Sequence, residues 1–321
     1  MHIPDGFLDT KTAVTTGLLS LSGLGTAVHH ASRNIQSRLM PLVGLSAAFV
    51  FVAQMINFPV AAGTSGHLLG ATLVAVLLGP SPAVIVMVCV LIIQALIFAD
   101  GGILAIGANI LNMAIVAPIS GYGLYRMIHL VLRDRRGQLI AASVAAWFST
   151  VMASTICAGE LALSGVTSWS LAFPAMAGIH SLIGIGEGLI TMLVLAAIGT
   201  TRPELLPGSN ALQATGERRS VSMYGAIIIL GLLILVVPFT SKLPDGLEKV
   251  AQTLGFEYRL HQYHQLPTVL QGYNLPGFAS PAMASVVAGL VGAVVAFGLS
   301  IVLAQILVPK RKKILSHTPN D

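Results

Sequence analysis

Nine apolar runs separated by polar stretches most constrain how this chain of 321 residues can fold. Several of them approach the roughly 20 residues that an α-helix needs to cross a bilayer. Hydrophobic residues make up 55% of the chain and charged residues only 9%, which is too apolar for a soluble domain. The alternating pattern of a membrane β-barrel is absent. The sequence therefore predicts an all-α, polytopic membrane protein with about nine transmembrane helices, seven followed by two. The runs cover residues 11–30, 39–57, 67–79, 82–99, 103–125, 139–163, 173–199, 222–240 and 281–308.

The basic residues predict the orientation of these helices. Thirteen of the 17 lysines and arginines follow the first, fifth, seventh or ninth run. They are Arg33, Arg38, Arg126, Arg133, Arg135, Arg136, Arg202, Arg218, Arg219, Lys310, Arg311, Lys312 and Lys313. With nine crossings these connections share one side, and the positive-inside rule makes that side the cytoplasm. We therefore expect a multi-pass protein of the inner (plasma) membrane, with the N-terminus outside and the C-terminus cytoplasmic.

Polar stretches divide the chain into two unequal parts. Residues 1–199 contain the first seven runs, and residues 200–221 form a linker with several prolines and glycines, expected in the cytoplasm. Residues 222–309 hold the last two runs around an outer loop at 241–280, which is long enough to carry a small structured element. Residues 310–321 form a basic cytoplasmic tail.

Several functions are disfavoured by the sequence. Cys89 and Cys157 lie inside apolar runs, so neither predicts a disulfide or a thiolate metal site. The net charge of +5 comes from scattered loop residues and does not predict binding to nucleic acid. The sequence contains neither a Gly-x-x-x-x-Gly-Lys-Ser/Thr phosphate loop nor a His-Glu-x-x-His motif. Any active transport would therefore draw its energy from another subunit.

The start of the chain offers nitrogen donors that suit a metal ion. The amine of Met1, the amide nitrogen of His2 and the Nδ1 atom of His2 can close two adjoining chelate rings in one plane. A bulky second residue also protects the initiator methionine, so Met1 is the expected amine donor. Tetragonal nitrogen sites suit Ni(II). The turn chemistry of Pro4-Asp5-Gly6 can fold the tip back onto the protein, but a fourth ligand must come from elsewhere.

His67 is the candidate fourth ligand. It ends the stretch Gly63-Thr64-Ser65-Gly66-His67, which breaks the helical pattern and is expected on the same outer side as Met1. Non-helical backbone at membrane depth is tolerated only where it is buried in protein or lines a cavity. A lone loop histidine is more often a surface group, so the shared side with His2 is what favours a metal ligand.

Asp100 and Asn109 are polar groups embedded in apolar sequence, and Gln54 and Gln94 have similar settings. Polar groups inside a membrane are costly and are therefore candidates for function. They can orient a metal-binding histidine by hydrogen bonding to it from behind. They can equally join packed helices to one another.

His180 and Glu187 are seven residues apart, which places them on one helix face, two turns apart. A buried pair or a structural network is favoured over a second metal site, and Glu160 is a candidate partner. Together with Asp100 and Asn109 they are the candidates for a layer of groups behind the metal ligands.

Two further patterns have a structural and a functional interpretation. Gly23, Ala27 and Ala31 repeat at intervals of four, which allows close helix packing within the chain or against a second membrane protein. His261 and His264 in the outer loop either collect metal weakly or are plain surface residues.

These motifs together resemble the CbiM/NikM family, the substrate-capturing membrane components of energy-coupling-factor cobalt and nickel transporters. The resemblance covers residues 1–199, and Pro244-Asp245-Gly246-Leu247-Glu248 is similar to the CbiN/NikN-type companion subunit, here fused to the C-terminus. Its motifs are Met1-His2-Ile3-Pro4-Asp5-Gly6-Phe7, the stretch from Gly63 to Gly70, Asp100-Gly101-Gly102 with Asn109, and the segment from His180 to Glu187.

The resemblance implies that the amine of Met1, the main-chain nitrogen and imidazole of His2, and the imidazole of His67 hold the metal. It further implies that Gly23, Ala27 and Ala31 contact a CbiQ/NikQ-like transmembrane coupling subunit. Cytoplasmic CbiO/NikO-like ATPase subunits would then drive uptake. Ni²⁺ or Co²⁺ is the expected transported substrate, and no cofactor is expected.

Three classes of function follow from the sequence. The leading hypothesis is capture of Ni²⁺ or Co²⁺ outside the cell for ATP-driven uptake by an energy-coupling-factor ABC transporter. An autonomous ion-coupled metal carrier or channel would instead use Asp100, His180 and Glu187 as relay groups. A membrane metalloenzyme is disfavoured because four nitrogen ligands leave no open position for chemistry. A planar nitrogen site disfavours Zn²⁺, Mg²⁺ and Ca²⁺ and favours nickel, while cobalt stays open.

Overall fold

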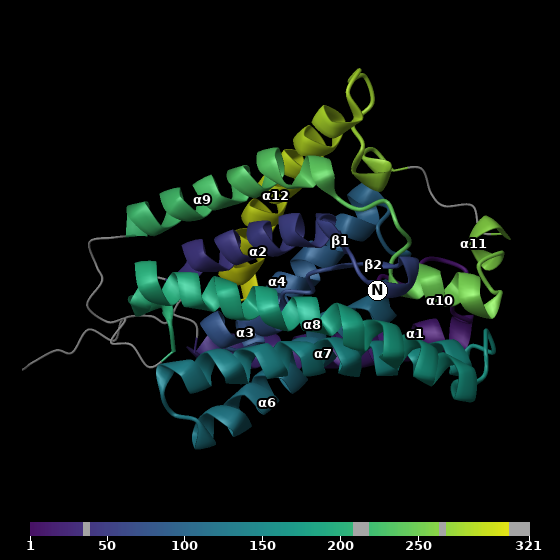
Figure 1. Ribbon diagram of the computed structural model, residues 1–321, viewed down its shortest axis with the longest axis horizontal. Coiled ribbons are helices and arrows are strands. Elements are labelled where there is room, and N and C mark those ends of the chain that lie inside the picture. Colours follow the sequence, from purple (N-terminus) through teal and green to yellow (C-terminus); the bar gives the residue numbers. More distant parts are fainter. Residues whose placement is uncertain (35–38, 208–217, 263–267, 308–321) are drawn as a thin grey trace, which may run out of the picture.

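The computed structural model describes residues 1–34, 39–207, 218–262 and 268–307 (Figure 1). Within these ranges the chain is almost entirely helical, which confirms the all-α class. The α-helices are α1 (Thr10–Asn34), α2 (Met40–Met55), α3 (Ala71–Leu78), α4 (Pro80–Ile93), α5 (Ile106–Asn109), α6 (Ala117–Val131), α7 (Arg135–Leu163), α8 (Trp169–Thr201), α9 (Arg218–Leu235), α10 (Gly246–Leu254), α11 (Arg259–Gln262) and α12 (Pro281–Leu307). The π-helical turns are η3 (Gln94–Phe98), which extends α4, and η4 (Ile110–Val116), which joins α5 to α6; the 3₁₀ turns are η2 (Ala61–Gly63), η5 (Pro203–Leu205), η6 (Val237–Phe239) and η7 (Gln271–Tyr273).

Each of the nine predicted apolar runs forms a helix. Five helical segments are long and apolar enough to cross a membrane, in agreement with an integral multi-pass protein. They are Pro80–Phe98, Arg135–Leu163, Trp169–Thr201, Val221–Phe239 and Pro281–Ile306. Helix α3 is much shorter than its run. Its eight residues rise only about 12 Å along the helix axis. The number of nine crossings and the orientation of the termini remain predictions.

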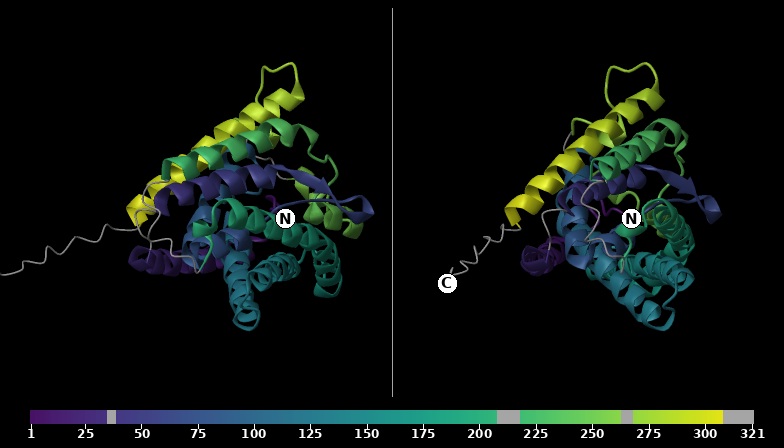
Figure 2. Two further views of the ribbon diagram at one scale, coloured as in Figure 1. Left: turned by 60° about the vertical axis from the view of Figure 1, so that its left-hand side comes forward. Right: turned by 90° about the vertical axis from the view of Figure 1, so that its left-hand side faces the viewer.

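Helices α7 and α8 pack along each other, and α6 packs on α7. Helices α9 and α12 pack on α2, on the other side of the molecule from α6 and α7 (Figures 1 and 2). The last two long helices therefore form a second layer against the first part of the chain.

A short antiparallel hairpin is the one sheet of the described residues. Strands β1 (Asn57–Pro59) and β2 (Ser65–His67) pair with Asn57 opposite His67. Ala62 and Gly63 have positive φ angles of 62° and 67°, which turn the chain between the strands. The Gly- and Ser-rich stretch thus departs from helix, as the sequence predicts.

The chain begins inside the bundle instead of at a frayed surface end. Met1, Ile3 and Phe7 are buried, and the N-terminus lies among β2, α8 and α10 (Figure 1). Helix α10 packs on α8, so the outer loop of the C-terminal part reaches the start of the chain.

The small residues of α1 face the interior of this chain. Ala27 and Ala31 are buried, and a Cβ atom on Gly23 would lie 2.5 Å from the Cδ1 atom of Ile115. The stripe thus lets α1 approach η4 within this chain. Contact of these three residues with a coupling subunit stays a prediction. Cys89 and Cys157 are buried and free.

Candidate metal centre

The N-terminal arm is fixed by hydrogen bonds to its main chain. Asn109 accepts from the amide nitrogen of Ile3 at 2.7 Å and donates to the carbonyl oxygen of Ile3 at 3.0 Å. The Gly102 amide donates to the same carbonyl at 2.8 Å. The carboxylate of Asp5 accepts from the amide of Leu104 at 2.8 Å. The arm thus has one defined path into the bundle, and Asn109 holds the arm itself without contacting a histidine side chain.

His67 is positioned by the hairpin and by α8. A Cβ atom on Gly66 would lie 2.6 Å from Ile183, so only glycine allows β2 to come this close to α8. Beyond the strand, Glu187 accepts from the amides of Leu69 at 2.5 Å and Gly70 at 2.8 Å. The segment that carries His67 is therefore anchored on both sides of the histidine.

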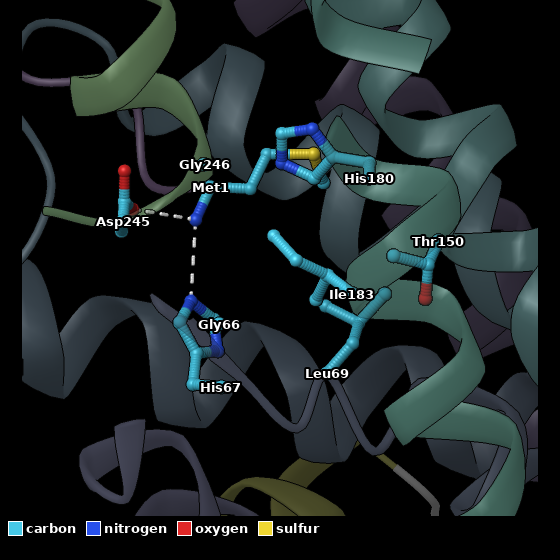
Figure 3. A pocket seen from close by; sticks show the side chains of 9 residues that line it. All are labelled: Met1, Gly66, His67, Leu69, Thr150, His180, Ile183, Asp245 and Gly246. Carbon is cyan, nitrogen blue, oxygen red and sulfur yellow. Dashed lines mark hydrogen bonds and ion pairs between the residues drawn. The ribbon is translucent and has the colours of Figure 1, made fainter. Parts of the chain in front are cut away.

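The amine of Met1 and the imidazole of His67 come together in this site. The amine nitrogen lies 3.2 Å from the Nε2 atom of His67 (Figure 3). The Nδ1 atom of His67 lies 3.2 Å from the carbonyl oxygen of Leu68, which can only accept. In a neutral ring the proton is therefore on Nδ1, and the lone pair of Nε2 faces the amine.

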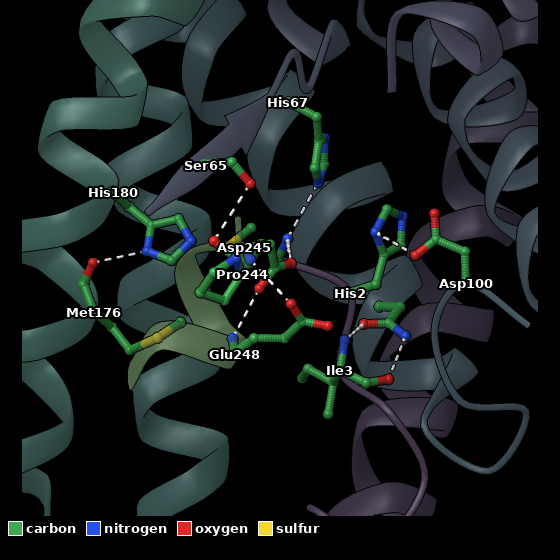
Figure 4. A network of polar contacts seen from close by, with 12 residues as sticks. His2, Ile3, Ser65, His67, Asp100, Met176, His180, Pro244, Asp245 and Glu248 are labelled. Atoms are coloured by element: carbon green, nitrogen blue, oxygen red, sulfur yellow. Dashed lines mark hydrogen bonds and ion pairs between the residues drawn. The ribbon is translucent and has the colours of Figure 1, made fainter. Parts of the chain in front are cut away.

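His2 lies beside His67, but its ring faces another way. The two ring centroids are 5.2 Å apart. The Nδ1 atom of His2 lies 3.2 Å from Asp100 Oδ1 (Figure 4). Its Nε2 atom lies 3.2 Å from Gln94 Oε1. Both ring nitrogens thus face oxygen atoms, and a neutral ring can donate to only one of them.

Burial keeps the two histidines neutral. Desolvation by burial lowers the pKa of His67 to about 3, with a further contribution from the Met1 ammonium. Burial also lowers the pKa of His2, although Asp100 opposes the change. Neutral imidazoles are the form that binds metals.

Asp245 is a member of the site that the sequence analysis did not single out. The Met1 amine donates to its Oδ2 atom at 2.9 Å (Figures 3 and 4). Burial alone would raise the pKa of Asp245, but the Met1 ammonium and the Glu248 amide hold the pKa below its ordinary value. The sequence feature that could have indicated Asp245 is the repetition of Pro-Asp-Gly at residues 4–6 and 244–246.

Tyr273 was also missed. Its hydroxyl donates to Asp100 and accepts from the side chain of Gln94 at 3.2 Å. Two residues of the C-terminal part thus reach the site: Asp245 contacts the Met1 amine, and Tyr273 contacts Asp100, the acidic neighbour of His2.

His180 and Glu187 lie on one face of α8 but do not form a pair. His180 donates from Nδ1 to the carbonyl oxygen of Met176 at 2.8 Å, and its Nε2 atom has no hydrogen-bond partner among the described residues. The predicted partnership with Glu160 is wrong, because Glu160 accepts from Asn112 at 2.6 Å across the interface of α7 and η4. Gln54 donates to the carbonyl oxygen of Leu69 at 2.9 Å and so also supports the His67 segment. His264 lies outside the described residues.

The chemistry of the donors fits a chelate that includes main-chain nitrogen. Among the described residues, no group of three or more His, Cys, Asp or Glu side chains is arranged to hold a metal ion. The amine of Met1 and the adjoining amide of His2 are main-chain nitrogen donors, which are additional to any such group of side chains. A cavity of about 530 Å³ borders His2 and is lined in part by Asp100 and Asp245.

Comparison with known proteins identifies the family. The chain matches the CbiM model, described as the cobalt uptake substrate-specific transmembrane region, over residues 2–205 and the PDGLE domain over residues 219–309. A putative fused nickel transport protein NikMN of Archaeoglobus fulgidus is 35% identical over 307 residues, covering 95% of this chain and 98% of that protein. The fused nickel transport protein NikMN of Rhodobacter capsulatus is 34% identical over 272 residues, covering 79% of this chain and 78% of that protein.

A solved structure agrees with these sequence matches. A crystal structure of a truncated transition metal transporter superposes with a TM-score of 0.57 at 35% identity, covering 62% of this chain and 98% of that one. These relatives are named as transport proteins. The chain therefore belongs to the CbiM family of cobalt and nickel transport proteins, and it carries a PDGLE domain in the same polypeptide.

Proposed function

We propose that this chain captures Ni²⁺ or Co²⁺ at the outer side of the membrane through the amine of Met1, the amide and imidazole of His2, and the imidazole of His67. The observation that carries the proposal is the partly buried contact of 3.2 Å between the Met1 amine and the Nε2 atom of His67. The two nitrogen atoms belong to residues that are 66 positions apart in the sequence, and each can donate a lone pair to a metal ion.

Completing the chelate requires a local change at His2. Its Nδ1 atom faces Asp100 and must turn toward the amine, while the Oε1 atom of Gln94 can accept a hydrogen bond from the Nε2–H group. A hydrogen bond from the distal ring nitrogen fixes the tautomer of a metal-binding histidine. Binding must also remove protons from the amine and the amide, so we expect it to weaken at low pH.

Nickel is the substrate that we propose first. A planar set of four nitrogens suits Ni(II) on ligand-field grounds. The relatives that share the fused two-part architecture are named as nickel transport proteins, whereas relatives matching mainly the first part include cobalt transport proteins. Cobalt is the alternative cargo of the same site.

A titration with Ni(II) tests the site. The native protein is compared with a version that carries additional residues before Met1, which converts the amine into an amide. We expect the extended protein to lose both tight binding and the visible d–d absorption of planar nickel. Equal binding by the two versions would overturn the N-terminal chelate.

We further propose that a transmembrane coupling subunit and cytoplasmic ATPases drive uptake of the captured ion. The proposal is supported by the absence of a phosphate-binding loop from the sequence and by the family resemblance. Nickel uptake should be lost when the partner ATPase is inactivated by mutation. Uptake into vesicles by this chain alone would instead favour an autonomous carrier.

A further inference from the structure

Among the described residues, the carboxylate of Asp245 is the charged group that contacts the Met1 amine but plays no part in the proposed chelate. It lies 244 residues away along the chain, at the start of α10 in the PDGLE domain. Its side chain is 18% exposed, and the contact with the amine measures 2.9 Å. The second part of the chain therefore reaches the first atom of the proposed metal site.

The turn before α10 is fixed to the strand that carries His67. The Ser65 amide donates to the carbonyl oxygen of Pro244 at 2.8 Å, and the Ser65 hydroxyl donates to that of Leu243 at 2.7 Å. A Cβ atom on Gly246 would lie 2.8 Å from the Nε2 atom of His180 and 2.9 Å from Ile183. Glycine at this position thus lets the turn approach α8 closely enough for Asp245 to reach the amine.

The two carboxylate oxygens of Asp245 have separate tasks. Oδ1 accepts from the Glu248 amide at 2.8 Å and caps α10, while the Glu248 side chain accepts from the Asp245 amide at 3.0 Å. This reciprocal capping box fixes the carboxylate. Oδ2 is left to face the Met1 amine.

We propose that Asp245 is a positioning residue of the capture site, so that the PDGLE domain contributes directly to metal binding. An amine that binds a metal keeps two N–H groups. A fixed carboxylate that accepts from one of them determines where the nitrogen lone pair points. The other polar contact of the amine is with the Nε2 atom of His67. Because both of these nitrogens would bind the ion, the contact with Asp245 is the one that would keep the amine oriented. The inference rests on the proposed N-terminal chelate.

The test compares two substitutions in the full-length chain with its native start. Asp245→Asn removes the charge, but asparagine caps helices as well as aspartate does, so α10 should stay intact. Glu248→Gln is the matched control, because it removes a charge from the same turn but keeps a side-chain oxygen that accepts from the Asp245 amide in the capping box. We expect Asp245→Asn to weaken Ni(II) binding about 10- to 100-fold, the usual effect of losing a group that orients a ligand. Glu248→Gln should bind like the native protein.

A double substitution separates positioning from general structure. In the protein extended before Met1 there is no free amine, so Asp245→Asn should not lower the residual binding further. If Asp245→Asn binds like the native protein while the extension abolishes binding, the role of Asp245 is wrong and the chelate stands. If Asp245→Asn and Glu248→Gln weaken binding equally, the proposed role of Asp245 is also wrong. If the extension itself has no effect, the proposed chelate fails and this inference fails with it.

Discussion

At the scale of single residues, burial decides the chemical state of the proposed ligands. His67 has an ordinary pKa of 6.5, and desolvation lowers the pKa in the folded protein to about 3. Its Nδ1–H group is directed at the Leu68 carbonyl, so Nε2 is ready to bind without losing a proton. The protons released on capture therefore come from the main-chain donors and not from this ring.

The lowered pKa of His67 predicts how the metal-free protein responds to pH. Between pH 6.5 and 3 the unfolded chain protonates this histidine while the folded protein does not, so acid favours unfolding. We expect the midpoint of thermal unfolding in detergent to fall as the pH decreases below 6.5. His67→Gln should reduce that slope, and an unchanged slope would show that other groups cause it.

Asn109 predicts a separable effect on the N-terminal arm. Asn109→Ala leaves the buried amide of Ile3 without an acceptor, which costs about 1–3 kcal/mol, whereas the Ile3 carbonyl keeps its hydrogen bond from Gly102. We expect faster hydrogen exchange at the Ile3 amide and weaker Ni(II) binding. Asn112→Ala, which removes a bond to Glu160 instead, should leave exchange at Ile3 unchanged. Equal exchange in the two variants would contradict this role.

At the scale of elements, α8 supports two segments that carry site residues. Ile183 packs against Gly66 of β2 and against Gly246 of the turn before α10. The same helix presents Glu187 to the amides that follow His67. A single helix therefore sets the position of His67 from one side and of Asp245 from the other.

The close packing of β2 predicts a rescue experiment. Gly66→Ala would place a Cβ atom 2.6 Å from Ile183 and should displace the strand that carries His67, weakening Ni(II) binding. Adding Ile183→Ala removes the clashing atoms and should restore much of the affinity. Gly178 lies in α8, the helix that carries Ile183. A Cβ atom at Gly178 would meet no atom within 4 Å, so Gly178→Ala serves as the control. Loss of affinity that Ile183→Ala does not relieve would point to another cause.

Glu187 predicts an effect on stability as well as on binding. Glu187→Ala leaves two buried amide groups without an acceptor, which should destabilise the fold by about 2–6 kcal/mol. We expect a smaller loss for Glu187→Gln, which keeps one acceptor oxygen, and weaker metal binding in both variants. Glu160→Gln alters another buried carboxyl group that contacts Asn112, and metal binding should be retained. Unchanged stability of Glu187→Ala would contradict the anchoring role.

At the scale of the whole molecule, the site lies where the two parts of the chain meet. The first part supplies Met1, His2 and His67, and the second covers them with the turn at Asp245 and the loop at Tyr273. The carboxylate-lined cavity beside His2 is also formed by both parts. Removal of the second part should therefore change how the ion enters and leaves.

Truncation tests this arrangement. A chain ending at residue 207 loses the Asp245 contact and the cover over the amine. We expect it to bind Ni(II) more weakly and to release it faster to a chelator in stopped-flow measurements. Full-length protein carrying Asp245→Ala should show part of the same change. Equal release rates for the full and truncated chains would show that the second part does not close the site.

The sequence by itself determined the fold class and the identity of the proposed ligands. Apolar runs define membrane helices through local composition, and the chelate of Met1 and His2 lies within two consecutive residues. Only the tertiary structure decided which distant groups surround that chelate. It placed Asn109 on the arm, Glu160 on Asn112, the small residues of α1 inside the bundle, and Asp245 on the amine. Hydropathy and residue spacing describe residues that are close in the sequence. A contact between Met1 and Asp245 depends instead on how the intervening helices pack.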